Sequence, residues 1–295
     1  MTFSASEAAF EGFRIVRRRP LAVLAWALAY IAFFGVGFLI VGKPVIAMMH
    51  QVEVLEGVAQ PTMAQVAPML QGYGLILGVI WPLSMVLSAM LSTAIARSVL
   101  QPKNSRLGYL RLGKDELRVL GATIVLFVLL GVYYFIAVMV CVMLGVAAHL
   151  TGQGWLWIFV VLAVFAALGG LIWLAVRLSL LVPLTLAENR FSLFGSFTLT
   201  KGRFWPLLGM AVLAVVMAIV VSLLGMIIGL PLRLSLMGPF AEVATSGDIW
   251  PLIQQHIGLI IAWVIINALL SALQLAIMQA PFAAAYRDIK GVATV

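Results

Sequence analysis

The 295-residue chain has little charge, few acidic residues and a single cysteine. Charged residues make up 9% of it, whereas about 25% is usual for a soluble domain. The lone Cys141 excludes an internal disulfide, and its apolar neighbours disfavour a reactive thiolate. No Asp or Glu falls inside the long apolar runs. That absence argues against a proton-coupled transporter, because such proteins normally carry acids inside the membrane.

What is abundant is apolar sequence, at 64% of the chain. A soluble fold cannot bury that much apolar surface, whereas lipid can solvate it. A spanning helix needs about 20 mainly apolar residues, and six runs meet this length. We therefore predict an all-α polytopic membrane protein that forms one domain over residues 1–295. The expected spans are 20–42, 74–96, 120–150, 155–176, 204–230 and 257–280.

The positive charges are distributed unequally between the two sides of these spans. Sixteen of the eighteen Lys and Arg residues lie before the first run or after the second, fourth and sixth. Only Lys43 and Arg233 fall on the opposite side. Because Lys and Arg accumulate in cytoplasmic loops, both termini are predicted to be cytoplasmic. Topology and anionic headgroups at the cytoplasmic leaflet then account for the net charge of +8, and we expect no nucleic-acid partner.

Three junctions mix basic residues with aromatic residues or leucine. They cover residues 10–20, 109–118 and 197–206, and each leads into an odd-numbered span. Helices that lie in the membrane interface have this composition. The pattern predicts three repeats, each an interfacial segment followed by a helical hairpin. The alternative is that any basic flank of a spanning helix has this composition.

Small residues recur at helical spacing in two spans. Span two carries Ser84, Ser88 and Ser92 on one face, and span five carries Ser222, Gly225 and Gly229. Small residues let neighbouring helices approach closely, so we interpret both faces as helix-packing surfaces. The alternative is a polar conduit lined by hydroxyl groups.

Span six carries Asn267, Ser271 and Gln274 on one face. Polar side chains at membrane depth are costly unless they find partners. Either they bond to the serine face of span two, or they line a site for a polar headgroup or solute between spans two, four and six.

A cytoplasmic segment after span four has a basic and aromatic character. Arg177 either binds lipid phosphate or extends to the headgroups. We expect Pro183 to end the helix and Asn189 to cap a new one. Arg190, Lys201 and Arg203 then form an inner-leaflet surface suited to anionic lipid.

Catalytic signatures are absent from the sequence. It has no P-loop, no Gly-x-Ser-x-Gly motif, no paired-cysteine metal motif and no Rossmann fingerprint. The histidines, at positions 50, 149 and 256, lack tight metal-ligand spacing. We therefore predict no catalytic site, no metal site and no cofactor.

The stretch from 177 to 205 also resembles a known family. It contains Arg177, Pro183, Glu188 and a Leu-Thr-Lys-Gly-Arg segment, and Pro281-Phe-Ala-Ala-Ala-Tyr-Arg-Asp follows near the end of the chain. These residues resemble the bacterial membrane domain of glycerophosphoryl diester phosphodiesterases and the related YciC-like inner-membrane proteins. The resemblance implies six spans in a bacterial inner membrane. It does not imply phosphodiesterase activity, because the soluble catalytic barrel of that family is missing here.

The sequence thus predicts a non-enzymatic membrane protein, either a lipid-interacting scaffold or an accessory subunit of a membrane complex. Its expected partners are membrane lipids, and either another membrane protein or further copies of the chain. The alternative is a transporter or lipid-handling protein that uses the polar face of span six.

Overall fold

The computed structural model describes residues 4–55, 58, 60, 62–102, 106–111 and 113–291. Within these ranges all regular structure is helical, as the sequence predicts, and no strand occurs. Six of the helices are long and apolar enough to cross a membrane. The elements in chain order are α1 (Ala5–Ala9), α2 (Glu11–Arg18), α3 (Pro20–Leu55), α4 (Met63–Leu100), η1 (Arg106–Tyr109), α5 (Lys114–Thr151), η2 (Gly154–Leu156), α6 (Trp157–Leu178), α7 (Leu181–Glu188), α8 (Leu193–Thr200), α9 (Phe204–Ser246) and α10 (Trp250–Lys290).

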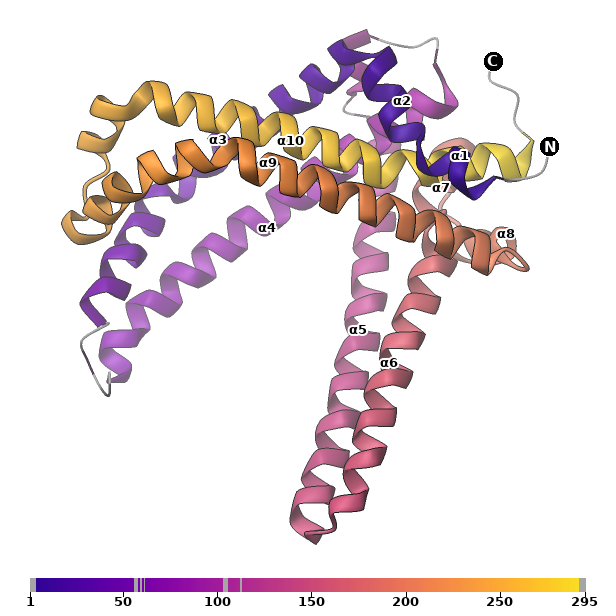
Figure 1. Ribbon diagram of the computed structural model, residues 1–295, viewed down its shortest axis with the longest axis horizontal. Helices are drawn as coiled ribbons and strands as arrows, with labels where there is room; N and C mark the ends of the chain where they lie inside the picture. The colour runs from indigo at the N-terminus through magenta and orange to yellow at the C-terminus, as the bar shows by residue number, and fades with distance from the viewer. Residues whose placement is uncertain are drawn as a thin grey trace.

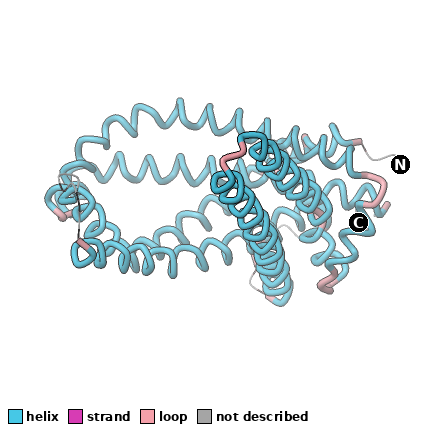
Figure 2. The backbone as a smooth tube through the Cα atoms, turned by 90° about the horizontal axis from the view of Figure 1, so that it is seen from below, coloured by secondary structure: helices cyan, strands magenta, loops and turns pink. Residues whose placement is uncertain are grey.

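The long helices form three hairpins, α3–α4, α5–α6 and α9–α10, which fan out from a common base (Figure 1). The short helices α1, α2, α7 and α8 lie at this base, near both ends of the described chain. The α5–α6 hairpin projects away from the other two, and Figure 2 shows the same separation from below. The segments between consecutive hairpins therefore share one end of the molecule, and the hairpin tips lie at the other ends.

Several helices are longer than the apolar runs predict. We expected the first span to end at Gly42, before Lys43 and Pro44, but α3 continues through Pro44 to Leu55. Helix α9 likewise continues past Pro231 and Pro239. A proline removes one backbone hydrogen bond and bends a helix, but neighbouring turns keep their bonds, so helices of membrane proteins tolerate it.

The core is centred on the half of α10 that lies nearer the base. Ala268, Ala272, Ala276 and Ala280 are buried at four-residue spacing and form one face of this helix. Helices α2, α3, α4 and α9 all pack against α10. Alanine lets these helices approach closely, so one narrow helix can serve as the common partner of several others.

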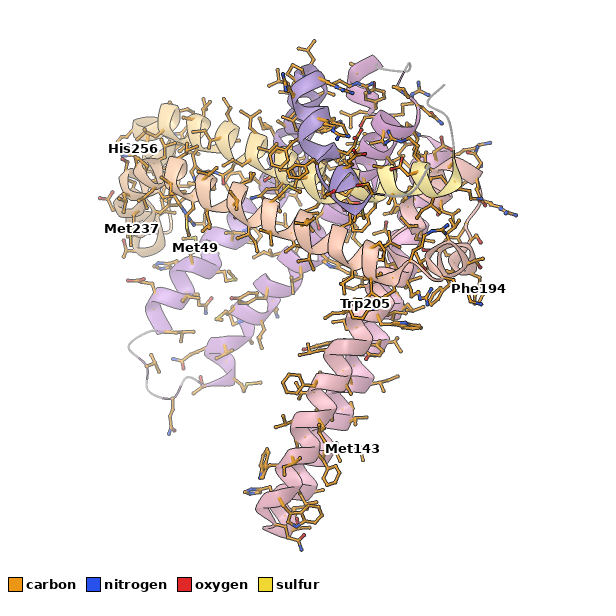
Figure 3. All side chains as sticks on the ribbon, turned by 45° about the vertical axis from the view of Figure 1, so that its right-hand side comes forward. Met49, Met143, Phe194, Trp205, Met237 and His256 are labelled. Atoms are coloured by element: carbon orange, nitrogen blue, oxygen red, sulfur yellow. The ribbon has the colours of Figure 1, made fainter. Side chains whose placement is uncertain are left out.

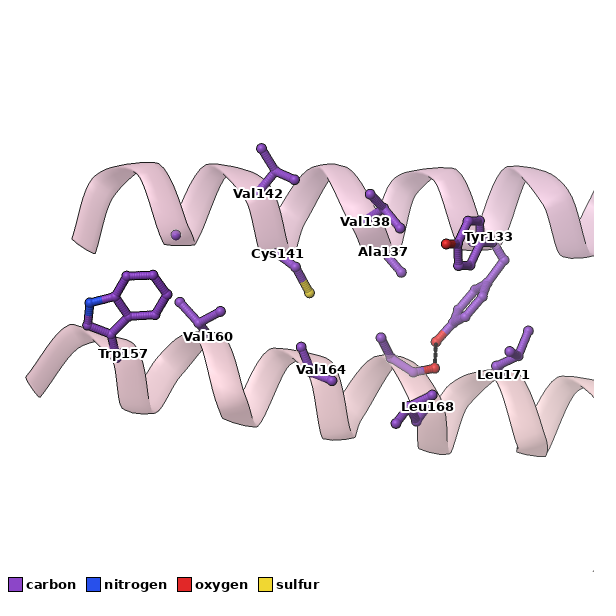
Figure 4. Close-up of a pocket in the computed structure, with 13 residues that line it drawn as sticks. Tyr133, Ala137, Val138, Cys141, Val142, Trp157, Val160, Val164, Leu168 and Leu171 are labelled. Atoms are coloured by element: carbon purple, nitrogen blue, oxygen red, sulfur yellow. Dashed lines mark hydrogen bonds between the residues drawn. The ribbon is translucent and has the colours of Figure 1, made fainter. Parts of the chain in front are cut away.

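The α5–α6 hairpin has a different character, because beyond the base it projects away from the other two hairpins (Figure 1). An apolar groove of about 380 Å³ runs between them, with Cys141 among its lining residues (Figure 4). The Tyr133 hydroxyl donates a hydrogen bond of 2.9 Å to the carbonyl oxygen of Ala167 across the groove. This hydrogen bond links the two helices across the groove, and Figure 4 draws it as a dashed line.

The connection between α6 and α9 differs from the prediction in two details. Helix α6 ends at Leu178, and Pro183 lies in the first turn of α7, where a proline costs no hydrogen bond. Asn189 does not begin a helix. It ends α7 in the left-handed conformation with φ 52°, which asparagine tolerates better than most residues. Ser192 caps α8 instead, accepting a hydrogen bond from the Gly195 N–H at 3.1 Å.

Replacing Gly12 by alanine tests the packing of α2 on α10. A Cβ atom at Gly12 would lie 2.6 Å from the Ile277 Cα, a backbone atom that cannot move away cheaply. We expect Gly12→Ala to lower the free energy of unfolding by about 1–3 kcal/mol, as overpacking does. Thermal unfolding in detergent, followed by size-exclusion chromatography, measures the loss. Gly209→Ala is the matched control, since a Cβ there meets nothing within 4 Å. Equal behaviour of the two variants would contradict the packing.

Candidate functional site

Two regions hold the side chains that the sequence singles out, and the first is the base near α8. Lys201 and Arg203 are exposed where α8 leads into α9, and among the described residues neither forms an ion pair. Beside them, Phe194 is 83% exposed and Trp205 is 77% exposed. Figure 3 labels both rings at the end of the molecule from which the α5–α6 hairpin departs. Exposed aromatic rings next to cations are typical of a membrane interface.

Helix α2 adds a second basic and aromatic surface to the base. Phe10 and Phe13 are exposed, and so are Arg17 and Arg18. The opposite face of α2 buries Gly12 and Ile15 against the core. Helix α2 is therefore amphipathic, with its basic residues on the outer surface, as helices that lie on anionic membranes are.

Arg190 does not belong to this free basic surface. Its guanidinium pairs with Glu188 at 3.0 Å, and the ammonium of Lys290 donates to the same carboxylate at 2.9 Å. The hydrogen bond from Lys290 holds the pKa of Glu188 below its usual range. Arg190 thus has a partner within the chain, whereas the sequence grouped it with the lipid-facing cations.

Arg177 is also engaged inside the base. Its guanidinium donates to the Phe197 carbonyl oxygen at 3.4 Å, and its carbon lies 5.6 Å from the centre of the Trp173 ring. The Ser196 hydroxyl donates to the Arg177 carbonyl oxygen at 2.7 Å. These bonds join the end of α6 to α8. The buried Nε of Arg177 has no hydrogen-bond partner among the described residues.

Sequence reasoning did not predict that Arg97, at the end of α4, is a buried and paired cation. It is 3% exposed and pairs with Asp115 at 3.0 Å and with Glu116, both in the first turn of α5. Glu116 also accepts a 3.0 Å hydrogen bond from the Gly113 N–H, which caps α5. The sequence signal was the Asp-Glu pair at the start of a helix, opposite a basic helix end.

The second region is a groove of about 390 Å³ between α9 and α10. The polar face of α10, formed by Asn267, Ser271 and Gln274, lines one wall. The small-residue face of α9 lines the other with Ser222, Gly225 and Gly229, and Arg233 lies at its tip end. The two features that the sequence treated separately therefore meet in one place.

The small residues of α9 divide between packing and lining. A Cβ at Gly225 would lie 2.6 Å from the Leu270 side chain, so this glycine sets the close approach of α9 and α10. A Cβ at Gly229 would meet nothing within 4 Å. Gly225 thus lies where α9 and α10 approach closely, and Gly229 leaves the groove open.

The serines of α4 do not meet the polar face of α10, contrary to one of the alternatives above. Ser84 lies beside Phe33 and Phe34 of α3, and its hydroxyl donates to the carbonyl oxygen of Trp81. Ser92 is buried and donates to Ala89. With Ser88 they lie on a helix that packs against both α3 and α10. Among the described residues, no hydrogen bond joins these serines to the polar face of α10.

The chain was compared with protein families, curated proteins and solved structures. No family model, no curated protein and no solved structure matches it. Among the residues that the structure describes, no three His, Cys, Asp or Glu side chains gather as metal ligands.

Removing Arg97 tests the buried ion pair. We expect Arg97→Ala to lower the free energy of unfolding by about 3–5 kcal/mol, because two carboxylates would lose their buried cation. Arg111→Ala, an exposed cation of the same loop, is the control and should change stability by less than about 0.5 kcal/mol. Adding Glu116→Gln to Arg97→Ala should recover part of the loss. Thermal unfolding of the four proteins measures these effects, and an unaffected Arg97→Ala would contradict the assignment.

Proposed function

We propose that this chain is a non-enzymatic integral membrane protein that binds anionic lipid at its cytoplasmic base and serves as a lipid-interacting scaffold or accessory subunit. The observation that carries the proposal is the pair of basic and aromatic surfaces at the base, where four exposed cations form no ion pair among the described residues. Lys201 and Arg203 of the α8–α9 junction, with Arg17 and Arg18 of α2, lie beside exposed aromatic rings. Each cation near an anionic surface contributes about 1 kcal/mol to the attraction.

The membrane placement belongs to the same proposal. The base faces the cytoplasm of a bacterial inner membrane, both termini are cytoplasmic, and the three hairpin tips reach the opposite face. The predicted threefold repeat, and the resemblance to the glycerophosphodiesterase membrane domain, likewise remain proposals.

Lipid selectivity tests the function. The protein is reconstituted with equal amounts of phosphatidylglycerol and phosphatidylcholine, and spin-labelled lipids report which lipid the protein surface selects. We expect a preference for phosphatidylglycerol. Lys201→Gln with Arg203→Gln should weaken the affinity of that surface by about thirtyfold, as the loss of two cations at about 1 kcal/mol each predicts.

The control for this experiment removes a charge from the other side. Lys43 is exposed on α3 near the hairpin tips, and Lys43→Gln should leave the selectivity unchanged. Equal association of both lipids with the wild-type protein would overturn the proposal.

The topology gives a separate prediction. Reporter fusions after residues 105 and 195 should be active only as cytoplasmic reporters, because the basic segments there are retained inside. Fusions after residues 55 and 245 should be exported. Export of the fusion after residue 105 or of the fusion after residue 195 would contradict the proposed cytoplasmic location of the base.

A further inference from the structure

The α9–α10 groove contains polar groups that the chain itself leaves without partners. In the described part of the chain, the side chains of Ser222, Ser271 and Gln274 form no hydrogen bond. The Asn267 amide donates only to the Trp263 carbonyl oxygen, at 2.8 Å on its own helix. Lipid tails offer such groups no hydrogen bonds, and each unsatisfied group costs several kcal/mol in hydrocarbon. An occupant with hydrogen-bonding capacity of its own removes that cost.

The charge of the groove selects the kind of occupant. Arg233 lines it, and among the described residues no carboxylate pairs with this guanidinium. No Asp or Glu lines the groove either. A single guanidinium surrounded by amides and hydroxyls suits an anion with several acceptor oxygens, and phosphate matches the planar fork of arginine.

An apolar hollow adjoins the polar groove and indicates that the occupant is amphiphilic. This hollow, of about 420 Å³, is lined by Leu230, Leu236, Met237 and Phe240, and shares Arg233 and Trp263 with the groove. The guanidinium therefore lies where a polar and an apolar compartment meet. The groove also carries apolar side chains of its own on the base side of Arg233, namely Leu223, Met226 and Leu270, so a phosphate joined to an apolar chain suits it.

We propose that the α9–α10 groove binds a phosphate-bearing lipid. Arg233 pairs with the phosphate, Asn267, Ser271 and Gln274 bond the glycerol and ester oxygens, and an acyl chain extends toward the base along the apolar side chains of the groove. The site is separate from the basic surfaces of the base and does not depend on them, because it contains neither Lys201 nor Arg203. It also gives the polar face of α10 a role that α4 does not supply.

Binding to the purified protein in detergent tests the proposal. The probes are phosphatidylglycerol, phosphatidylcholine and sodium phosphate, and native mass spectrometry reports bound lipid. We expect one phosphatidylglycerol to bind with an affinity that Arg233→Gln lowers about tenfold, as the loss of a charge-assisted bond predicts. Arg233→Lys should keep part of the affinity. Asn267→Leu with Gln274→Leu should lower it as well.

Controls separate the site from the base and from folding. Lys43→Gln and Ser84→Ala, both outside the groove, should bind as the wild type does. A photoactivatable phosphatidylglycerol on the unmodified protein should label peptides 222–240 and 263–274, so the test does not depend on any variant folding.

Three outcomes would overturn the proposal. The first is labelling confined to peptides of the base. The second is an effect of sodium phosphate alone that requires Arg233 while the lipid shows none, since it would assign the groove to free phosphate. The third is dissociation of a dimer on Arg233→Gln with no change in bound lipid, since it would assign the groove to a second copy of the chain.

Discussion

The whole arrangement depends on how closely other helices approach the base-proximal half of α10. Its buried alanines present a face with almost no side-chain bulk, and Gly12 of α2 brings a second backbone directly onto it at Ile277. Helices from both ends of the chain thereby meet at one place. Without a hydrophobic driving force between helices in lipid, such close contact is the main source of packing energy. The rest of each hairpin can then diverge towards its tip, as Figure 1 shows.

Electrostatics at the base complement this packing. Arg97 is buried between α4 and α5 and neutralised by Asp115 and Glu116, so the second hairpin is attached to the first by an ion pair in a region of low dielectric. Glu188, at the end of α7, forms ion pairs with two further cations, Arg190 and Lys290. Among the described residues, Arg17, Arg18, Lys201 and Arg203 form no ion pair, and they lie exposed on the outer surface of the base.

Local patterns predicted six helices that are long and apolar enough to span a membrane, because an apolar run depends only on neighbours within a few turns. The partner of the polar face on α10 could not be predicted, since a rotation of one helix decides whether Asn267 meets α4 or α9. The burial of Arg97 was hidden for a similar reason. A cation at a helix end looks the same in sequence whether it faces water or two carboxylates on the next helix. The prediction that the first helix ends before Pro44 was wrong, because this proline ends an apolar run but not the helix.

The most direct test of lipid binding is to measure which lipids stay with the protein when it leaves the membrane. The membrane would be extracted with a polymer that cuts out native discs without detergent, and the lipids and proteins in the discs identified by mass spectrometry. The account predicts anionic phospholipid enriched above its share of the surrounding membrane. Discs with the composition of the bulk membrane would contradict the claim that lipid binding is the function of this chain.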